Sequence, residues 1–117
     1  MSADAWSTVA AVAGRQSPRL RIARLAAEAA IATPGVLSLR AGGVRVTASA
    51  GGRVDGVVVT AARNGRYEVE LHLVCELVPL PALAEAVRSA VLVAIADAGL
   101  GDAVGPVHVR IEEIAGA

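Results

Sequence analysis

Two histidines and two glutamates are the side chains whose types and spacing come nearest to a chemical site. His72 and His108 fall on the polar side of two alternating segments, beside Glu70 and Glu112. Two imidazoles and two carboxylates can hold a transition metal if the two segments are neighbouring strands with the right stagger. Solvated histidines on an exposed sheet face explain the same pattern without that stagger. We therefore predict neither a metal site nor a bound cofactor.

The nucleophile candidates are one cysteine and several serines. Cys75 falls on the apolar side of its segment, which predicts a buried, inert thiol and excludes a disulfide within the chain. No base lies nearby in the sequence for Ser17, Ser38, Ser49 or Ser89. The glycine pairs match no phosphate-loop pattern and no helix follows them, so they predict turns. These observations predict a protein that is not an enzyme and has no small-molecule substrate.

A long alternating segment, residues 66–78, must position these candidates. Alternate residues on one of its sides are apolar, namely Tyr67, Val69, Leu71, Leu73, Cys75 and Leu77. This period of two predicts a strand with one buried face, and a slip of one residue would bury glutamates instead. Residues 107–114 alternate in the same way, with Val107, Val109 and Ile111 opposite His108, Arg110 and Glu112. They predict a second strand.

The turn before the long strand decides the register of a predicted hairpin. Its Asn64-Gly65 pair is a strong hairpin signal. A two-residue loop would turn Thr60 towards the core, whereas a three-residue loop turns Val57 and Val59 there. We predict the three-residue loop, because two valines then reach the core and Gly65 takes the left-handed bulge position.

Two helices and further short strands complete the predicted elements. A hydroxyl cap and a proline start one helix over residues 18–33, and a Pro-Gly pair ends it. Residues 80–98 carry apolar side chains at helical spacing, with Gly99 placed to end that helix in the left-handed conformation. Residues 36–40, 44–49 and 57–62 predict three strands that lead into the long one. The last strand, after the second helix, predicts a right-handed parallel crossover.

Together these elements predict a two-layer α+β fold, a small mixed β-sheet with both helices packed on one face. The 117 residues suffice for one domain, which we place at residues 17–117. Residues 1–16 predict a flexible arm, whose lone Trp6 either folds back onto the domain or contacts a partner. The sequence has neither a signal peptide nor the apolar run of about 18 residues that spans a bilayer, so we expect a cytoplasmic protein.

Charge is distributed unevenly along the chain. Residues 1–66 carry nine Arg and three acids, a net charge of +6, and residues 67–117 carry two Arg and eight acids, a net charge of −6. Either the halves interleave and their charges mix, or opposed faces favour head-to-tail self-association. The arginines also admit a small RNA-binding module. The absence of a GxxG loop and of aromatic side chains on an outer strand face disfavours nucleic acid as a partner.

Four segments carry a resemblance to a known family. They are IARLAAEAAIATPGV, GVVVTAARNGRYEVELHLVCEL, LAEAVRSAVLVAIADAGL and VGPVHVRIEEI. Over about residues 20–114 the chain resembles the alkaline shock protein family, also described as envelope stress response proteins. Members often end the long strand with an aromatic-glycine pair, where Leu77-Val78-Pro79 stands here. The resemblance implies a bacterial, cytosolic, non-enzymatic scaffold in cell-envelope homeostasis, which forms homo-oligomers or docks on a membrane-anchored protein.

The outer helical surface is the predicted contact surface. Leu92 and Val93 fall outside the apolar core stripe of the second helix, and Ile22 and Leu25 widen that of the first. Two helices side by side bury part of this excess apolar surface against each other. The remainder predicts an exposed apolar patch with a charged rim, and Arg24 also belongs to that rim. The predicted protein interface comprises Arg21, Ile22, Leu25, Glu85, Arg88, Leu92 and Val93.

Overall fold

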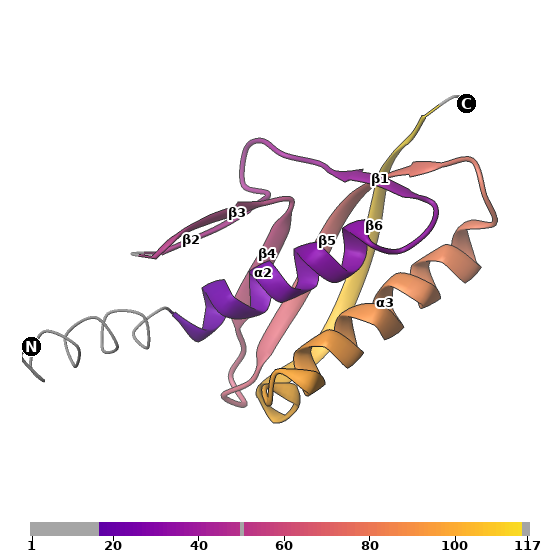
Figure 1. Ribbon diagram of the computed structural model, residues 1–117. Helices are drawn as coiled ribbons and strands as arrows, with labels where there is room; N and C mark the ends of the chain where they lie inside the picture. The colour runs from indigo at the N-terminus through magenta and orange to yellow at the C-terminus, as the bar shows by residue number, and fades with distance from the viewer. Residues whose placement is uncertain (1–16, 50, 116–117) are drawn as a thin grey trace, which may run out of the picture.

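The computed structural model describes residues 17–49 and 51–115 (Figure 1). The predicted arm at residues 1–16, with Trp6, lies outside these residues. The elements in chain order are α2 (Pro18–Ile31), β1 (Val36–Leu39), β2 (Val46–Ser49), β3 (Gly52–Asp55), β4 (Val57–Ala61), β5 (Tyr67–Glu76), α3 (Leu80–Asp97), the 3-10 turn η1 (Gly101–Ala103) and β6 (Val104–Ala115). None of these helices is long and apolar enough to cross a bilayer.

The long strand β5 is the centre of a mixed sheet. Strand β6 pairs with it in parallel, while β4 and β1 both pair with it antiparallel. The backbone of His72 shows where β4 and β1 meet, because its N–H donates to the carbonyl of Gly56 at 2.9 Å and its carbonyl accepts from the N–H of Arg40 at 2.8 Å. Both groups of one strand residue point to the same edge, so β4 and β1 lie end to end along one side of β5 and β6 takes the other.

The hairpin between β4 and β5 has the predicted register. Val59 pairs with Val69 and Val57 with Leu71, so both valines reach the buried face. The loop over residues 63–65 is closed by a hydrogen bond from the N–H of Ala62 to the carbonyl of Arg66, and Gly65 has a φ of 80°. The prediction of a three-residue loop with a left-handed glycine is confirmed.

Both helices pack on one face of the sheet, as predicted (Figure 1). The buried core joins Ile22, Ala23, Ala26 and Ala30 of α2 and Leu83, Val87, Val91 and Ile95 of α3 to the inner side chains of β4, β5 and β6. Helix α2 begins at the predicted cap, where the hydroxyl of Ser17 accepts from the N–H of Leu20, and it ends at Ile31, two residues before the predicted end. Helix α3 ends at Asp97, and Gly99 has a φ of 78°.

The segment between β1 and β4 departs from the prediction. Residues 46–49 pair with β3, which was not predicted, in a separate two-stranded sheet instead of leading into β5. The hydroxyl of the fully buried Thr47 donates to the carbonyl of Val57 at 2.7 Å and accepts from the N–H of Val59 at 3.0 Å. The β2–β3 hairpin therefore lies against the edge of β4. The side chain of Thr47 makes the hydrogen bonds there that the backbone of a paired strand would make.

Strand β6 is interrupted by bulges that change which residues face the core. Leu73 pairs with Ile111 but Val74 pairs with Glu113, so Glu112 is an extra residue in β6. Such an insertion shifts the alternation of the strand by one residue. Ile111 packs against the core, Ile114 is half-buried opposite the core residue Cys75, and both intervening glutamates are exposed. The simple alternation predicted for residues 107–114 fails at this point.

Candidate functional site

The predicted interface residues do not all lie on the surface. Leu92 is 41% exposed and Val93 is 59% exposed, on the side of α3 that faces away from the sheet. Arg21 and Glu85 are exposed as well, whereas Leu25 and Arg88 are half-buried. Ile22 is fully buried in the core between α2 and the sheet, so its inclusion in an exposed interface was wrong.

Helix α3 is apolar around most of its circumference, yet only one of its sides is covered. The covered side presents Leu83, Val87, Val91 and Ile95 to the core. The opposite side is exposed at Ala82, Glu85, Ala86, Ser89, Leu92, Val93 and Ala96. A helix that is hydrophobic all round is usually buried all round. The exposed side of α3 is therefore one place where this molecule leaves apolar surface uncovered, beside single exposed side chains such as Val44 and Leu77 in the connections between elements.

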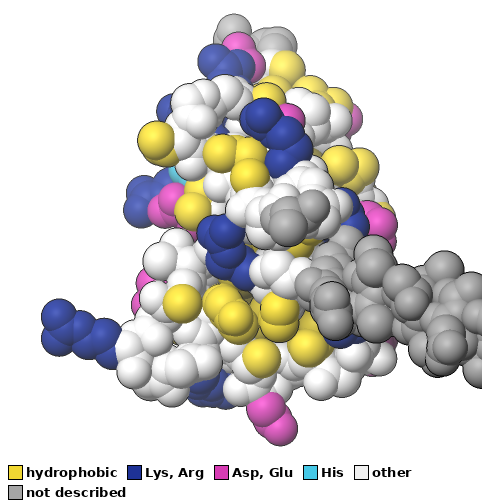
Figure 2. Space-filling view, turned by 90° about the vertical axis from the view of Figure 1, so that its left-hand side faces the viewer, with side chains coloured by type: hydrophobic (Ala, Val, Ile, Leu, Met, Phe, Trp, Pro, Cys, Tyr) yellow, Lys and Arg dark blue, Asp and Glu magenta, His cyan; other side chains and the backbone are white. Residues whose placement is uncertain are grey.

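Charged side chains lie on both flanks of that exposed side. On one flank Arg88 donates from Nε to the carbonyl of Val107 at 3.0 Å and forms an ion pair with Glu85 at 2.5 Å. Beside the C-terminal end of α3 an open hollow separates it from α2, and its lining residues are Arg21, Arg24, Leu25, Glu28 and Ala98. Figure 2 shows the end of the molecule on the left of Figure 1, where basic, acidic and hydrophobic side chains are interspersed.

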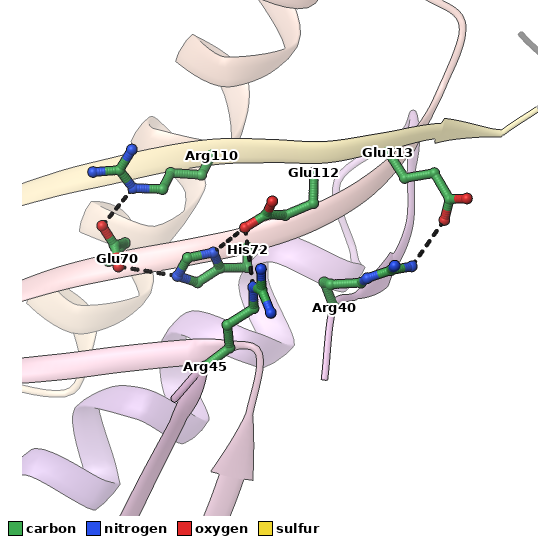
Figure 3. Close-up of polar contacts among 7 residues, drawn as sticks. All are labelled: Arg40, Arg45, Glu70, His72, Arg110, Glu112 and Glu113. Atoms are coloured by element: carbon green, nitrogen blue, oxygen red, sulfur yellow. Dashed lines mark hydrogen bonds and ion pairs between the residues drawn. The ribbon is translucent and has the colours of Figure 1, made fainter. Parts of the chain in front are cut away.

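The outer face of the sheet, opposite the helices, carries a continuous polar network (Figure 3). His72 lies at its centre and is only 7% exposed. Its Nδ1 lies 2.5 Å from a carboxylate oxygen of Glu112, and its Nε2 lies 3.0 Å from a carboxylate oxygen of Glu70. Arg110 donates to Glu70 at 2.5 Å, and Arg45 donates to Glu112 at 3.1 Å. The prediction that His72 is a solvated side chain was wrong, because these neighbours cover it.

The network lowers the pKa values of both of its carboxyl groups, Glu70 and Glu112. The hydrogen bond from Arg110, with a smaller contribution from His72, lowers the pKa of Glu70 despite partial burial. The hydrogen bonds with His72 and from Arg45 lower the pKa of Glu112. Each of the two carboxyl groups lies between a ring nitrogen of His72 and an arginine. The network is thus a linear series of five side chains, with His72 in the middle and an arginine at each end.

The β6 bulge explains how two neighbouring glutamates both join this face. Glu112 reaches His72 and Arg45, while Glu113 forms an ion pair with Arg40 at 3.1 Å. Arg40 and Arg45 belong to the positive half of the sequence, and both glutamates belong to the negative half. The charges of the two halves therefore mix on this face, which was the first of the two predicted alternatives.

The four residues considered as metal ligands, Glu70, His72, His108 and Glu112, do not come together around one point. In the register of β5 and β6, Glu70 lies opposite the exposed His108, and His72 lies opposite Arg110, so the two histidines are not directly paired. Among residues 17–49 and 51–115, no group of three or more His, Cys, Asp or Glu side chains is placed to hold a metal ion. Cys75 is buried on the helix-covered face, and burial raises the pKa of its thiol.

Sequence reasoning missed the arginines of this network. Arg110 had been placed on the correct face, but Arg40 and Arg45 precede β2 and donate to Glu113 and Glu112, which follow them in the chain by 73 and 67 residues. The one available signal was the spacing of Ile111 and Ile114, which breaks a period of two.

No family model, no curated protein and no solved structure matches this chain.

Proposed function

We propose that this protein is a non-catalytic adaptor that acts through protein contacts, including contacts with a second copy of itself, on the cytoplasmic side of a bacterial cell envelope. The resemblance of four segments to alkaline shock proteins supports the cellular setting. The exposed side of α3 supports the mode of action. A membrane-anchored protein is the second kind of partner that the proposal includes.

The exposure of Leu92 and Val93 carries this proposal. Both side chains lie on a helix whose opposite side is already packed into the core, so no rotation of α3 covers them without uncovering Val87 or Val91. Removing a large aliphatic side chain from water is worth about 1.5 to 3 kcal/mol when burial is complete. Contact with another protein is a way to gain part of this free energy, and a charged rim around an apolar centre is typical of such contacts.

The RNA-binding alternative lacks a comparable observation. Arg40, Arg45 and Arg110 on the outer sheet face each bind a glutamate. Binding to phosphate would have to replace these ion pairs, which reduces the net gain. We therefore favour protein contacts over nucleic acid as the basis of function.

A pull-down from membranes of the source organism tests the proposal. The wild-type domain is the bait, with and without high salt, and a Leu92→Asp bait is the matched control. We expect wild type to retain a discrete protein partner that the variant loses, and we expect purified wild type to sediment above the monomer mass. A strict monomer that recovers only nucleic acid or a small molecule would contradict the proposal.

A further inference from the structure

The loop between β4 and β5 contains Asn64, the only asparagine of the chain, and Gly65 follows it. The backbone nitrogen of the residue that follows an asparagine can attack the carbon of the side-chain amide and close a cyclic imide. Glycine hinders this attack least, because it has no side chain. Residues 63–66 are all exposed, so water reaches the loop. The loop therefore has the residues and the access that this chemistry needs.

The side chain of Asn64 is folded back over the peptide that would attack it. The N–H of Arg66 donates to Oδ1 of Asn64 at 3.0 Å. An asparagine that accepts from the backbone two residues on forms a closed turn around the residue between, which here is Gly65. Attack on the amide carbon places negative charge on Oδ1, and a donor already aimed at that oxygen stabilises such charge. The contact with Arg66 thus favours both the approach and the addition.

Gly65 must lose its N–H proton in the attack, and the charge around the loop favours that loss. Arg63 and Arg66 flank the Asn64-Gly65 pair. Among the ion pairs between described residues, none includes either of these arginines. Nε of Arg66 donates instead to a neutral group, the carbonyl of Asp102, at 3.2 Å. Positive charge nearby favours the ionised form of a group that becomes negative.

One hydrogen bond opposes the attack. The N–H of Gly65 donates to the carbonyl of Ala62 at 3.1 Å, and this bond must open first. The hairpin itself is closed by a different bond, from the N–H of Ala62 to the carbonyl of Arg66 at 2.8 Å. Opening the bond of Gly65 therefore leaves the pairing of β4 and β5 intact. Exposed loop bonds of this kind open more readily than those of a core strand.

A second pair that ends in glycine, Asp55-Gly56, lies where the same attack is blocked. Gly56 is buried, and its N–H donates to the carbonyl of Arg45 at 2.7 Å. The carboxylate of Asp55 forms an ion pair with Arg53, also at 2.7 Å. A following glycine is thus not sufficient, and the exposed loop distinguishes Asn64 from Asp55.

We propose that Asn64 is a site of spontaneous deamidation in the folded protein. The nitrogen of Gly65 forms a bond to Cγ of Asn64, and the side-chain nitrogen leaves as ammonia with the proton of Gly65. Water then opens one of the two C–N bonds of the imide. Opening at Cγ gives aspartate, and opening at the main-chain carbonyl carbon gives isoaspartate. Water is the only co-reactant that the balance requires.

The two products affect the hairpin differently. Aspartate keeps the main chain as it was, and its carboxylate still accepts from the N–H of Arg66. Isoaspartate carries the main chain through the former side chain, which lengthens the loop by one carbon atom. The three-residue loop, with Gly65 at a φ of 80°, sets the register that pairs Val59 with Val69. Isoaspartate is therefore the product that should destabilise the hairpin.

Mass spectrometry of the purified protein during storage in mildly alkaline buffer tests the proposal. Asn64→Gln is the matched control, because its longer side chain would have to close a larger ring. Wild type unfolded in urea gives the rate for the same sequence without the folded loop. Because the chain has no other asparagine, a mass gain that the control lacks is assigned to Asn64.

We expect native wild type to gain the mass that a carboxyl group has over an amide, at a rate within a few times that of the unfolded chain. Asn64→Gln should stay unchanged, and digests of aged wild type should contain both aspartate and isoaspartate at this position. A native rate many times lower than that of the unfolded chain would show that the loop protects Asn64 and would overturn the proposal. An equal mass gain in Asn64→Gln would also overturn it, because the reaction would then lie elsewhere.

Discussion

His72 of β5 lies 2.5 Å from Glu112 of β6, measured from Nδ1 to Oε1, and Glu112 occupies the bulge of β6. Regular alternation after Arg110 already places this carboxylate on the same side of the sheet as the imidazole, and the bulge brings Glu113 to that side as well. With Glu70 on the other ring nitrogen and Arg45 beyond Glu112, a histidine on the outer face of the sheet is almost as buried as a core residue. The network therefore joins β5, β6 and the segment before β2.

Replacing the buried histidine should destabilise the fold. His72→Ala removes both contacts to carboxylates and leaves them without their shared partner, and losing one partner of a buried polar group costs about 1 to 3 kcal/mol. His108→Ala is the matched control, because His108 is exposed. We expect its effect to stay within about 0.5 kcal/mol. Urea unfolding of both variants checks this, and equal effects would show that the network contributes nothing specific.

The network also predicts how stability depends on pH. The pKa values of Glu70 and Glu112 are lowered from their ordinary value of 4.5. The folded state thus prefers both groups ionised, and this contribution is fully present above pH 4.5 and is lost as the pH falls through the lowered pKa values. The urea midpoint of wild type should fall more steeply below pH 4.5 than that of the Glu70→Gln, Glu112→Gln double variant. Parallel curves would contradict the prediction.

We expect the hydroxyl of Thr47 to contribute substantially to the free energy of unfolding. Thr47→Val keeps the shape of the side chain but leaves the carbonyl of Val57 and the N–H of Val59 without this partner. We expect a loss of about 1 to 3 kcal/mol in the free energy of unfolding. Thr60→Val, at an exposed position of β4, makes the same chemical change and should be nearly neutral. Similar losses in the two variants would argue against the bridging role.

Gly56 is required where β4 and β1 meet beside His72. Its φ is 81°, and an added Cβ would lie 2.5 Å from the Cβ of Leu39. Gly56→Ala should therefore combine backbone strain of about 1 to 2 kcal/mol with a collision. Gly65→Ala has a similar φ of 80° but meets open space, so it should show the strain alone. Thermal unfolding compares them, and an equal decrease in melting temperature would exclude the collision.

Local patterns were enough to predict the hairpin and the two helices. The choice between Thr60 and the two valines Val57 and Val59 fixed the register, because only one loop length buries both valines. The cap at Ser17 and the glycine at Gly99 fixed two helix ends within a residue. Each of these features depends on residues close together in the sequence.

The features that were missed depend on residues far apart. The glycine pairs were predicted to form turns, but strand β3 after Gly51 was not predicted. Arg19 donates to the carbonyl of Ala48 at 2.6 Å, and Arg24 donates to that of Gly51 at 3.1 Å. These contacts from α2 hold the β2–β3 hairpin beside β4. Ile22 is likewise buried by packing against residues distant in the chain, in the core that α2 forms with α3 and the sheet. Neither the hairpin's position nor this packing has a signal in local periodicity.

Sedimentation of wild type beside Leu92→Asp tests the central claim most directly, which is that the exposed side of α3 mediates self-association. Val44→Asp is the control, because Val44 is 87% exposed and lies away from α3. We expect wild type and Val44→Asp to shift towards the dimer mass as concentration rises, while Leu92→Asp stays monomeric with a nearly unchanged melting temperature. A folded Leu92→Asp variant that dimerises as wild type does would contradict the account.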